Sequence, residues 1–239
     1  MKKMKVIIYA EHNKFCQSEQ CLKHYPKGIH GLLKDLFEKE HHEVKTFTMD
    51  NINQLDDNDL SECDVMLWWG HTFHNIVNDE LVEKIVDKVH CGMGFIALHS
   101  SHLAKPFKRL MGTPCTLKWR EANENERLWV INPTHPIAQG LNDFIDIEHE
   151  EMYGEPFAIP TPDELVFVGW FKGGNVFRSG CCYQRGYGKI FYFQPGHESY
   201  NTYNNKEIQK ILINALNWAK PVTKVEKVSC ENTQPLEKI

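Results

Sequence analysis

The 239-residue sequence lacks several short motifs that would identify its chemistry at once. Its eight cysteines include no Cys-x-x-Cys pair, so a zinc-ribbon site has no support. No Walker A loop and no Gly-x-Ser-x-Gly turn is present either. The segment Gly92-x-Gly94-x-x-Ala97 mimics a dinucleotide-binding fingerprint, but it precedes an expected strand instead of opening a helix. The sequence therefore gives no support for these phosphate-binding and serine chemistries.

Long apolar runs and an excess of positive charge are lacking too. The apolar run Met4–Ala10 is broken at once by Glu11 and His12, which makes it too short for a signal peptide or a membrane span. With 27 basic and 32 acidic residues, the formal charge is -5, so there is no electrostatic case for binding nucleic acid or anionic membranes. We expect a cytoplasmic protein without nucleic-acid or membrane partners, and we expect its cysteines to be reduced thiols.

The composition that remains is that of a folded domain. Hydrophobic residues make up 41% of the chain and charged residues 25%, which is sufficient for a real core. In the first half, short apolar runs alternate with amphipathic segments, which predicts a doubly wound parallel sheet. Strands are expected at residues 5–10, 44–48, 64–70 and 95–98, helices at 28–39 and from the cap Asn78 through Val89, and a long loop at 11–27.

After Gly112 the pattern changes to strands joined by Gly/Pro turns. Strands are expected at residues 127–131, 143–148, 164–171, 176–184 and 189–194, and one more helix at 206–219. We interpret them as a strand-rich extension of the same sheet. The expected fold class is therefore α/β, a doubly wound, mostly parallel sheet with helices on both faces, as in flavodoxin-like proteins. A single domain is expected over residues 1–220, followed by a loosely held polar tail at 221–239.

The stretch Gly92–His102 organises the functional prediction. Its apolar run is typical of a buried strand, His99 lies where that strand ends, and Ser101 is expected to begin a helix. In α/β enzymes such a turn exposes one side chain above the sheet and commonly holds a nucleophile. A histidine there favours proton transfer or metal binding instead. We expect the helix N-terminus to keep an accessible His99 ring neutral.

Histidines follow the ends of four expected strands: His12, His71, His99 and His197. Ligands of open parallel sheets bind beyond the carboxyl ends of the strands, so these side chains are expected at one edge. Any one of them alone is more often a surface or capping residue, but four at one edge are harder to explain in that way. We predict a divalent metal site, zinc by preference, at His71, His99 and His197, to which Glu151 can add a carboxylate.

Catalysis is assigned to His99, Glu151 and His197, because imidazole and carboxylate groups serve as general acids and bases. A wider set is expected to bind substrate: Glu11, His12, Trp69, Ser100, His102, Tyr153 and Glu198. In this interpretation Trp69 stacks on a sugar ring, and His102 is a ligand or a proton shuttle. Two structural alternatives stay open. The Trp68–Trp69 pair fits a hydrophobic core, and the charged segment 148–153 fits a solvated strand end.

Several longer motifs resemble one known family, the trehalose-utilisation (ThuA-like) family, through most of residues 5–220. The motifs that carry the resemblance are Trp68-Trp69-Gly70-His71, Gly94-Phe-Ile-Ala-Leu-His99-Ser100, Asn132-Pro-x-His135-Pro-Ile, Glu150-Glu-Met-Tyr153, Gly188-Lys-Ile-Phe-Tyr192 with Gly196-His197-Glu198, and Asn214-Ala-Leu-Asn-Trp218-Ala. Together they are specific, whereas no single one would be.

The resemblance implies a class I glutamine amidotransferase-like fold. True amidotransferases have a cysteine nucleophile where this sequence has His99, so glutamine hydrolysis is not expected. The pair His197-Glu198 nevertheless resembles their His-x-Glu pair. The family is associated with catabolism of trehalose and related disaccharides, alongside dehydrogenases that make 3-keto glycosides.

We therefore expect a metal-assisted enzyme of carbohydrate catabolism, acting on a disaccharide or its 3-keto derivative by isomerisation, elimination or hydrolysis. A ketone at C3 acidifies the neighbouring C–H bond, and a metal can stabilise the developing charge. Hydrolysis by two carboxylates, such as Glu151 and Glu198, is one alternative. A non-catalytic sugar-binding or regulatory protein on a decayed amidotransferase scaffold is another. The expected partner is a small-molecule carbohydrate, and the sequence leaves a homo-oligomer open.

Overall fold

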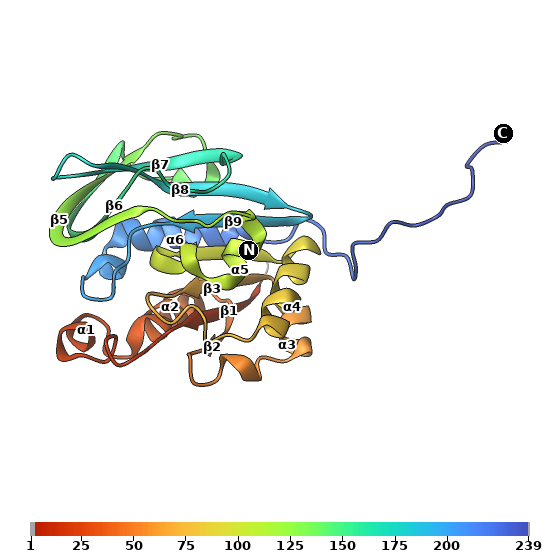
Figure 1. Ribbon diagram of the computed structural model, residues 1–239, viewed down its shortest axis with the longest axis horizontal. Coiled ribbons are helices and arrows are strands. Elements are labelled where there is room, and N and C mark those ends of the chain that lie inside the picture. The colour runs from red at the N-terminus through yellow and green to blue at the C-terminus, as the bar shows by residue number, and fades with distance from the viewer. Residues whose placement is uncertain (1–2, 239) are drawn as a thin grey trace.

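The computed structural model describes residues 3–238, and in this part of the chain nine strands form one sheet in the order β2-β1-β3-β4-β9-β8-β7-β5-β6 (Figure 1). The strands are β1 (Lys5–Ala10), β2 (Glu43–Phe47), β3 (Val65–Trp69), β4 (Gly94–Leu98), β5 (Lys118–Val130), β6 (Phe144–Gly154), β7 (Glu164–Phe171), β8 (Val176–Arg185) and β9 (Gly188–Phe193). The helices are α1 (Glu19–His24), α2 (Gly28–Lys39), α3 (Asp57–Glu62), α4 (Asp79–His90), α5 (Lys105–Met111) and α6 (Lys206–Ala219).

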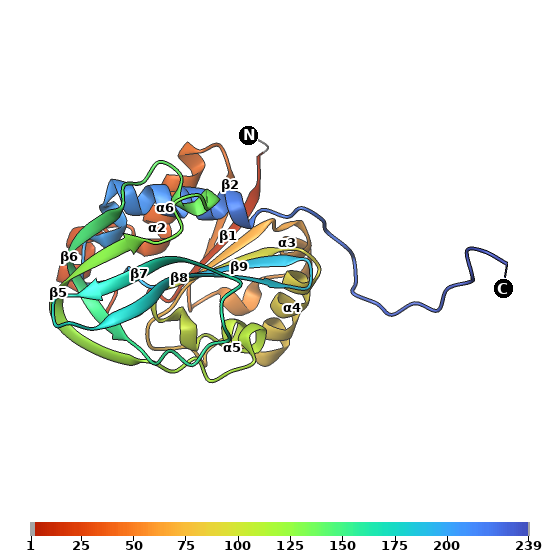
Figure 2. The same cartoon turned by 90° about the horizontal axis from the view of Figure 1, so that it is seen from above.

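The parallel half of the sheet is covered by helices on both faces, as Figure 2 shows from above. Strands β3 and β4 are buried along their whole length, which is why they are apolar without alternation. Val65 and Leu67 face α2 and α6, while Met66 and Trp68 face α3, α4 and α5. Asn78 caps α4 as expected, because its side chain accepts a hydrogen bond from the Leu81 amide. The prediction of an α/β sheet with two helical layers is confirmed here.

The prediction that the sheet is mostly parallel is wrong. Within the described residues, four pairings are parallel (β1–β2, β1–β3, β3–β4 and β4–β9) and four are antiparallel (β8–β9, β7–β8, β5–β7 and β5–β6). A parallel connection needs a crossover of about a dozen residues or more. The links between β7 and β8 and between β8 and β9 are short turns, so these strands can pair only in antiparallel fashion.

Two expected boundaries also differ. The segment 11–27, predicted as a loop, contains α1, whose N-cap Ser18 accepts a hydrogen bond from the Cys21 amide. The helix predicted to begin at Ser101 is split into a 3-10 turn, η2 (His99–Leu103), and α5, which begins at Lys105. Pro106 explains the second boundary, because proline is tolerated in the first turn of a helix and breaks its interior.

The C-terminal segment is attached to the body over its first residues. The Val225 amide donates to the Cys91 carbonyl at 2.9 Å, and Lys224 Nζ lies 2.8 Å from the Cys63 carbonyl and 2.9 Å from Asp64 Oδ1. Beyond this contact the chain runs away from the domain (Figure 1). The tail expected at 221–239 is therefore fastened at its start. Among residues 3–238, no helix is both long enough and apolar enough to cross a membrane.

Candidate metal centre and cleft

The candidate site lies at the carboxyl ends of β3, β4 and β9, where the sequence places His71, His99 and His197. His99 follows β4 directly and has a positive φ of 55°, a left-handed conformation that is strained for a non-glycine residue. It thus occupies the sharp strand-to-helix turn. The expectation that it is accessible is wrong, because His99 is completely buried and Tyr153 stacks on its ring at 5.2 Å.

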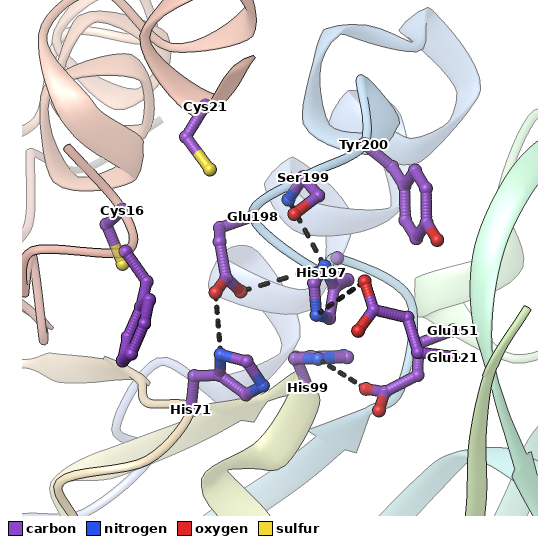
Figure 3. A network of polar contacts seen from close by, with 12 residues as sticks. Cys16, Cys21, His71, His99, Glu121, Glu151, His197, Glu198, Ser199 and Tyr200 are labelled. Atoms are coloured by element: carbon purple, nitrogen blue, oxygen red, sulfur yellow. Dashed lines mark hydrogen bonds and ion pairs between the residues drawn. The ribbon is translucent and has the colours of Figure 1, made fainter. Parts of the chain in front are cut away.

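Four side chains with ligating atoms meet at this point: His71, His99, His197 and Glu151 (Figure 3). One ligating atom from each lies within 4.8 Å of the others. The three histidines come from the parallel half of the sheet, and Glu151 comes from β6 in the antiparallel half. These are the four residues that the strand-end argument singled out for a metal.

The hydrogen bonds of two histidines suit them as metal ligands. His99 Nδ1 donates to the Gln194 carbonyl at 3.1 Å, which leaves Nε2 without a proton in the neutral ring. His71 Nδ1 lies 2.6 Å from Glu198 Oε1, so a proton on Nδ1 is held by the carboxylate and Nε2 is again free. Protein metal sites commonly orient histidine ligands through such carbonyl and carboxylate partners.

His197 meets this condition in one of two arrangements. Its Nδ1 lies 3.2 Å from the Ser199 amide and 3.8 Å from Glu198 Oε2. Only a proton on Nδ1 directed at Glu198 leaves Nε2 free to ligate. His197 Nε2 and Glu198 Oε2 are both buried without a hydrogen-bond partner. Glu151 Oε2 also has no hydrogen-bond donor unless His99 Nε2, 3.1 Å away, carries a proton. The unpartnered His197 Nε2 and Glu151 Oε2 fit a cation at the centre of the cluster.

The charges in the cluster are strongly coupled. Burial lowers the pKa of His99, but the hydrogen bond and charge of Glu151, 3.1 Å away, outweigh it and raise the pKa. Burial raises the pKa of Glu151, but the hydrogen bond and charge of His99 have the larger effect, so the pKa of Glu151 is lowered. Both shifts favour the ionic form of the pair, in contrast to the neutral ring expected from the helix terminus. A carboxylate in contact outweighs a partial helix charge.

His197 and Glu198 are shifted in ways that leave one neutral and the other charged. Burial, supported by the nearby His99, lowers the pKa of His197 to about 4 and keeps its ring neutral. Burial raises the pKa of Glu198, but interactions led by the hydrogen bond from His71 outweigh it, and the pKa is lowered to about 2. Glu198 is therefore a fixed anion behind the cluster. It positions His71 and His197 and does not face the cleft.

A cleft of about 460 Å³ opens over this cluster. Its floor is polar and includes His71, Ser100, Glu151 and Tyr153, while its rim includes Leu103, Leu117 and Trp119. Tyr153 Oη lies 2.5 Å from Ser100 Oγ and 3.4 Å from His99 Nε2. Burial raises the pKa of Tyr153 well above its ordinary value, so the phenol stays protonated.

His102 also lines the cleft. Its Nδ1 donates to the Cys115 carbonyl at 2.7 Å, and burial lowers its pKa to about 3, so the ring is neutral. Of the residues predicted to bind substrate, the structure thus brings Ser100, His102 and Tyr153 to the cleft.

Three other predicted residues lie elsewhere. Trp69 is 1% exposed and donates its indole N–H to the Gly196 carbonyl at 2.9 Å, so it is a core residue that fixes the His197 loop. Glu11 is buried and accepts hydrogen bonds from the amides of Thr72 and Phe73. It therefore fixes the loop that carries His71. His12 packs against His30, with ring centroids 4.8 Å apart, and does not line the cleft.

The sequence argument missed several residues of the site. Glu150 is completely buried and accepts hydrogen bonds from Gly196, His197 and Thr202, so it positions the His197 loop. The solvated strand end considered for segment 148–153 is therefore excluded at Glu150 and Glu151, which are both buried. Gln194 directly follows β9 and precedes the His197 loop, a position that could have indicated it.

Comparison with known proteins identifies the family of the chain. A model of the family described as trehalose utilisation (ThuA) matches residues 5–219, which is most of the chain. The chain belongs to the trehalose-utilisation family. The resemblance drawn from the sequence motifs is confirmed. No curated protein matches the sequence.

Solved structures share the fold at low sequence identity. A ThuA-like protein from Parabacteroides merdae is 16% identical, with a TM-score of 0.68 over 94% of this chain and 93% of its own. A cytoplasmic protein from Salmonella typhimurium is 12% identical, with a TM-score of 0.60 over 91% and 99%. A glutamine amidotransferase from Thermotoga maritima is 10% identical, with a TM-score of 0.54 over 91% and 97%. The likeness supports an amidotransferase-like fold for this family member.

Proposed function

We propose that this family member is a divalent-metal-dependent enzyme of carbohydrate catabolism that acts on a disaccharide or its 3-keto derivative. The observation that supports the proposal most directly is the convergence of His71, His99, His197 and Glu151 within 4.8 Å beneath an open cleft. Three imidazoles and a carboxylate favour zinc. A cytoplasmic location is part of the proposal, in line with the description of the Salmonella typhimurium protein.

The roles of the ligating residues follow from what each one faces. His99 and His197 are buried and do not line the cleft, so their role is to hold the ion. His71 and Glu151 do line the cleft. A bound divalent ion would polarise a ketone oxygen and stabilise the charge that develops when the adjacent C–H bond ionises. Three histidines suffice for a catalytic metal, which leaves Glu151 free to accept a proton.

The residues of the cleft then account for an elimination. Glu151 takes the proton from C2 of a 3-keto glycoside, and the electron pair of that bond forms the C1–C2 double bond. The C1–O bond breaks, and the released oxygen takes a proton. Tyr153 is the protonated group on the cleft floor that can supply it, with Ser100 within hydrogen-bond distance. An isomerisation uses the same base and returns the proton to the sugar.

The paired-carboxylate hydrolysis considered from the sequence has less support. Glu198 does not line the cleft, and its carboxylate is engaged with His71 behind the histidine cluster. It therefore cannot flank a glycosidic bond opposite Glu151. Glutaminase activity is not proposed, since the turn after β4 presents an imidazole where that chemistry needs a thiolate.

Metal content and turnover together test the proposal. Protein purified without a His-tag or chelator should hold about one divalent ion per chain and convert 3-keto trehalose. His71→Ala should lose the ion and reduce turnover at least ~100-fold. His149→Ala is the matched control, because His149 is half exposed on β6 outside the cluster, and it should retain both. Elemental analysis of the wild type that finds no metal above background would refute the metal site.

A non-catalytic sugar-binding protein is the remaining alternative. It predicts that the wild type binds the disaccharide with measurable affinity but converts neither trehalose nor 3-keto trehalose, with or without added zinc. That result would overturn the enzymatic part of the proposal.

A further inference from the structure

The rim of the cleft carries an indole that the proposed chemistry does not use. Trp119 is 66% exposed, although it lies on strand β5 within the sheet. In the β5–β6 ladder it is paired with Tyr153, the protonated phenol on the cleft floor. Directly paired residues of antiparallel strands point to the same face of the sheet. The indole therefore stands next to the candidate reaction site.

The neighbours of Trp119 make this part of the cleft apolar. Leu103, from the η2 turn, is 36% exposed, and Leu117 precedes Trp119 on the chain. His71, His102 and Glu151 supply polar groups to the same cleft, and His99 and His197 lie buried beneath it. The cleft thus has two regions of different chemistry. Its volume of about 460 Å³ lies within the range of roughly 300–1,000 Å³ that is typical of small-molecule sites.

We propose that Leu103, Leu117 and Trp119 form an outer subsite that binds the second pyranose ring of a disaccharide. A pyranose ring has hydroxyl groups around its edge and C–H groups on its faces. Its face can therefore pack on an indole while its hydroxyl groups remain in water. The first ring then occupies the polar floor. The inference rests on the proposed function for the choice of a sugar, and it adds a preference for disaccharides over monosaccharides.

The sequence argument gave this stacking role to Trp69, which the structure buries. Trp119 and Trp69 differ in what surrounds them. Trp69 has its indole N–H bonded to the Gly196 carbonyl and is 1% exposed. Trp119 is exposed and lines the cleft, so it is the indole that a ligand can reach.

Binding measurements with unreacted sugars test the subsite without requiring catalysis. Dissociation constants of trehalose and of methyl α-glucopyranoside would be measured by ligand-observed NMR for wild type, Trp119→Ala, Trp119→Phe and Trp129→Ala. Trp129 is the matched control, because it lies on the same strand, is 40% exposed and does not line the cleft. Melting temperatures of the four proteins would show that each one is folded.

The subsite predicts a specific pattern of affinities. Trp119→Ala should weaken trehalose binding roughly 10-fold, as expected for the loss of an aromatic stacking contact and its buried area. Trp119→Phe should restore most of the affinity. Binding of the methyl glucoside should be the same in all four proteins. This pattern would support the subsite even if no turnover is found, so its outcome is separate from that of the metal experiment.

Three results would overturn the proposal. Equal trehalose affinity in wild type and Trp119→Ala would show that the indole does not touch the sugar. Binding of neither sugar by the wild type would remove the ligand class itself. A change in oligomeric state on Trp119→Ala, with the sugar affinity unchanged, would assign the indole to a subunit contact instead.

Discussion

Buried charged residues do most of the positioning around the cluster. Glu198 and Glu150 lie behind the histidines, where the first contacts the imidazole of His71 and the second accepts hydrogen bonds from the backbone of the His197 loop. Neither carboxylate faces the cleft. Glu198 and Glu150 would affect metal binding indirectly, by orienting His71 and the His197 loop. They would not bind the metal themselves.

Glu198→Gln should weaken metal binding 10- to 100-fold, as expected for a carboxylate that orients histidine ligands. The neutral amide keeps the shape of the side chain but removes the charge that holds a proton on His71 Nδ1. A competition titration with a chromophoric chelator would measure the affinity. Glu148→Gln, at a carboxylate that is 88% exposed, should leave the affinity unchanged. An equal affinity in both variants would contradict the positioning role.

Glu126 is another buried carboxylate, and it is not one of the four residues that could hold a metal. Ser179 Oγ lies 3.2 Å from both Glu126 Oε1 and Gln194 Oε1, and a hydroxyl has one proton to donate. The Gln194 amide is already directed at the Glu151 carbonyl, at 3.2 Å. A proton on Glu126 is therefore needed to complete the chain. Burial, together with the charge of Glu150, raises the pKa of Glu126 well above 4.5.

This raised pKa predicts a pH-dependent difference in stability. The unfolded state releases the Glu126 proton near pH 4.5, whereas the folded state keeps it to higher pH, so the stability falls as pH rises between the two values. Glu126→Gln has no proton to lose. Its free energy of unfolding in urea should match the wild type near pH 4. Above that pH it should exceed the wild type increasingly, by up to about 1.4 kcal/mol per pH unit. If the free energies of unfolding of the two proteins instead change with pH in parallel, Glu126 is ionised in the folded state and the prediction is wrong.

His99→Ala separates folding from function at the turn after β4. An accessible histidine would cost less than ~1 kcal/mol on truncation. The observed burial and the bond to the Gln194 carbonyl raise the expected loss to about 1–3 kcal/mol, measured by urea unfolding. Metal binding and keto-sugar turnover should fall at least ~100-fold. His99→Cys should gain no glutaminase activity. Retention of both metal and turnover by His99→Ala would place the site elsewhere.

At the scale of elements, local sequence signals predicted some boundaries and missed others. The cap at Asn78 and the apolar stripe after it predicted α4 correctly, because both signals lie within the helix itself. The start of α5 was missed, although Pro106 was visible in the sequence, because the turn at His99 was expected to continue directly into a helix. The short α1 was missed since its six residues give little periodicity.

The C-terminal segment provides a prediction at this scale. Its contacts to the body are made by Lys224, Val225 and the Glu226 carbonyl, which accepts from Cys91 Sγ at 3.7 Å. Deleting residues 221–239 should lower the free energy of unfolding by about 1–2 kcal/mol, the net value of one or two hydrogen bonds. Deleting residues 227–239 should change it by less than ~0.5 kcal/mol. Equal free energies of unfolding of the two truncated proteins would show that residues 221–226 do not stabilise the fold.

At the scale of the whole molecule, the site is assembled from both halves of the sheet. The parallel half supplies the three histidines at its strand ends, and the antiparallel half supplies Glu151, Tyr153 and Trp119. The cleft is therefore lined from both halves, because His71 and Ser100 follow β3 and β4 while Trp119 and Tyr153 belong to β5 and β6.

The sequence by itself determined the parallel half and the group of histidines. Apolar strands that alternate with amphipathic helices define a doubly wound sheet, and the carboxyl ends of adjacent parallel strands meet at one edge. His71, His99 and His197 follow such ends and meet there, whereas His12, which follows β1, packs against His30 and does not join them. No side-chain contact needed to be known in advance.

Tertiary structure alone decided which neighbouring residues reach the cleft. Trp69 is adjacent in sequence to the cluster but points into the core, because the Gly196 carbonyl, 127 residues away, accepts its indole N–H. Trp119 had no local signal and faces the cleft because β5 pairs with β6 in one particular register. Such long-range pairings depend on how strands separated by many residues align. A local pattern of apolar and polar residues does not contain that information.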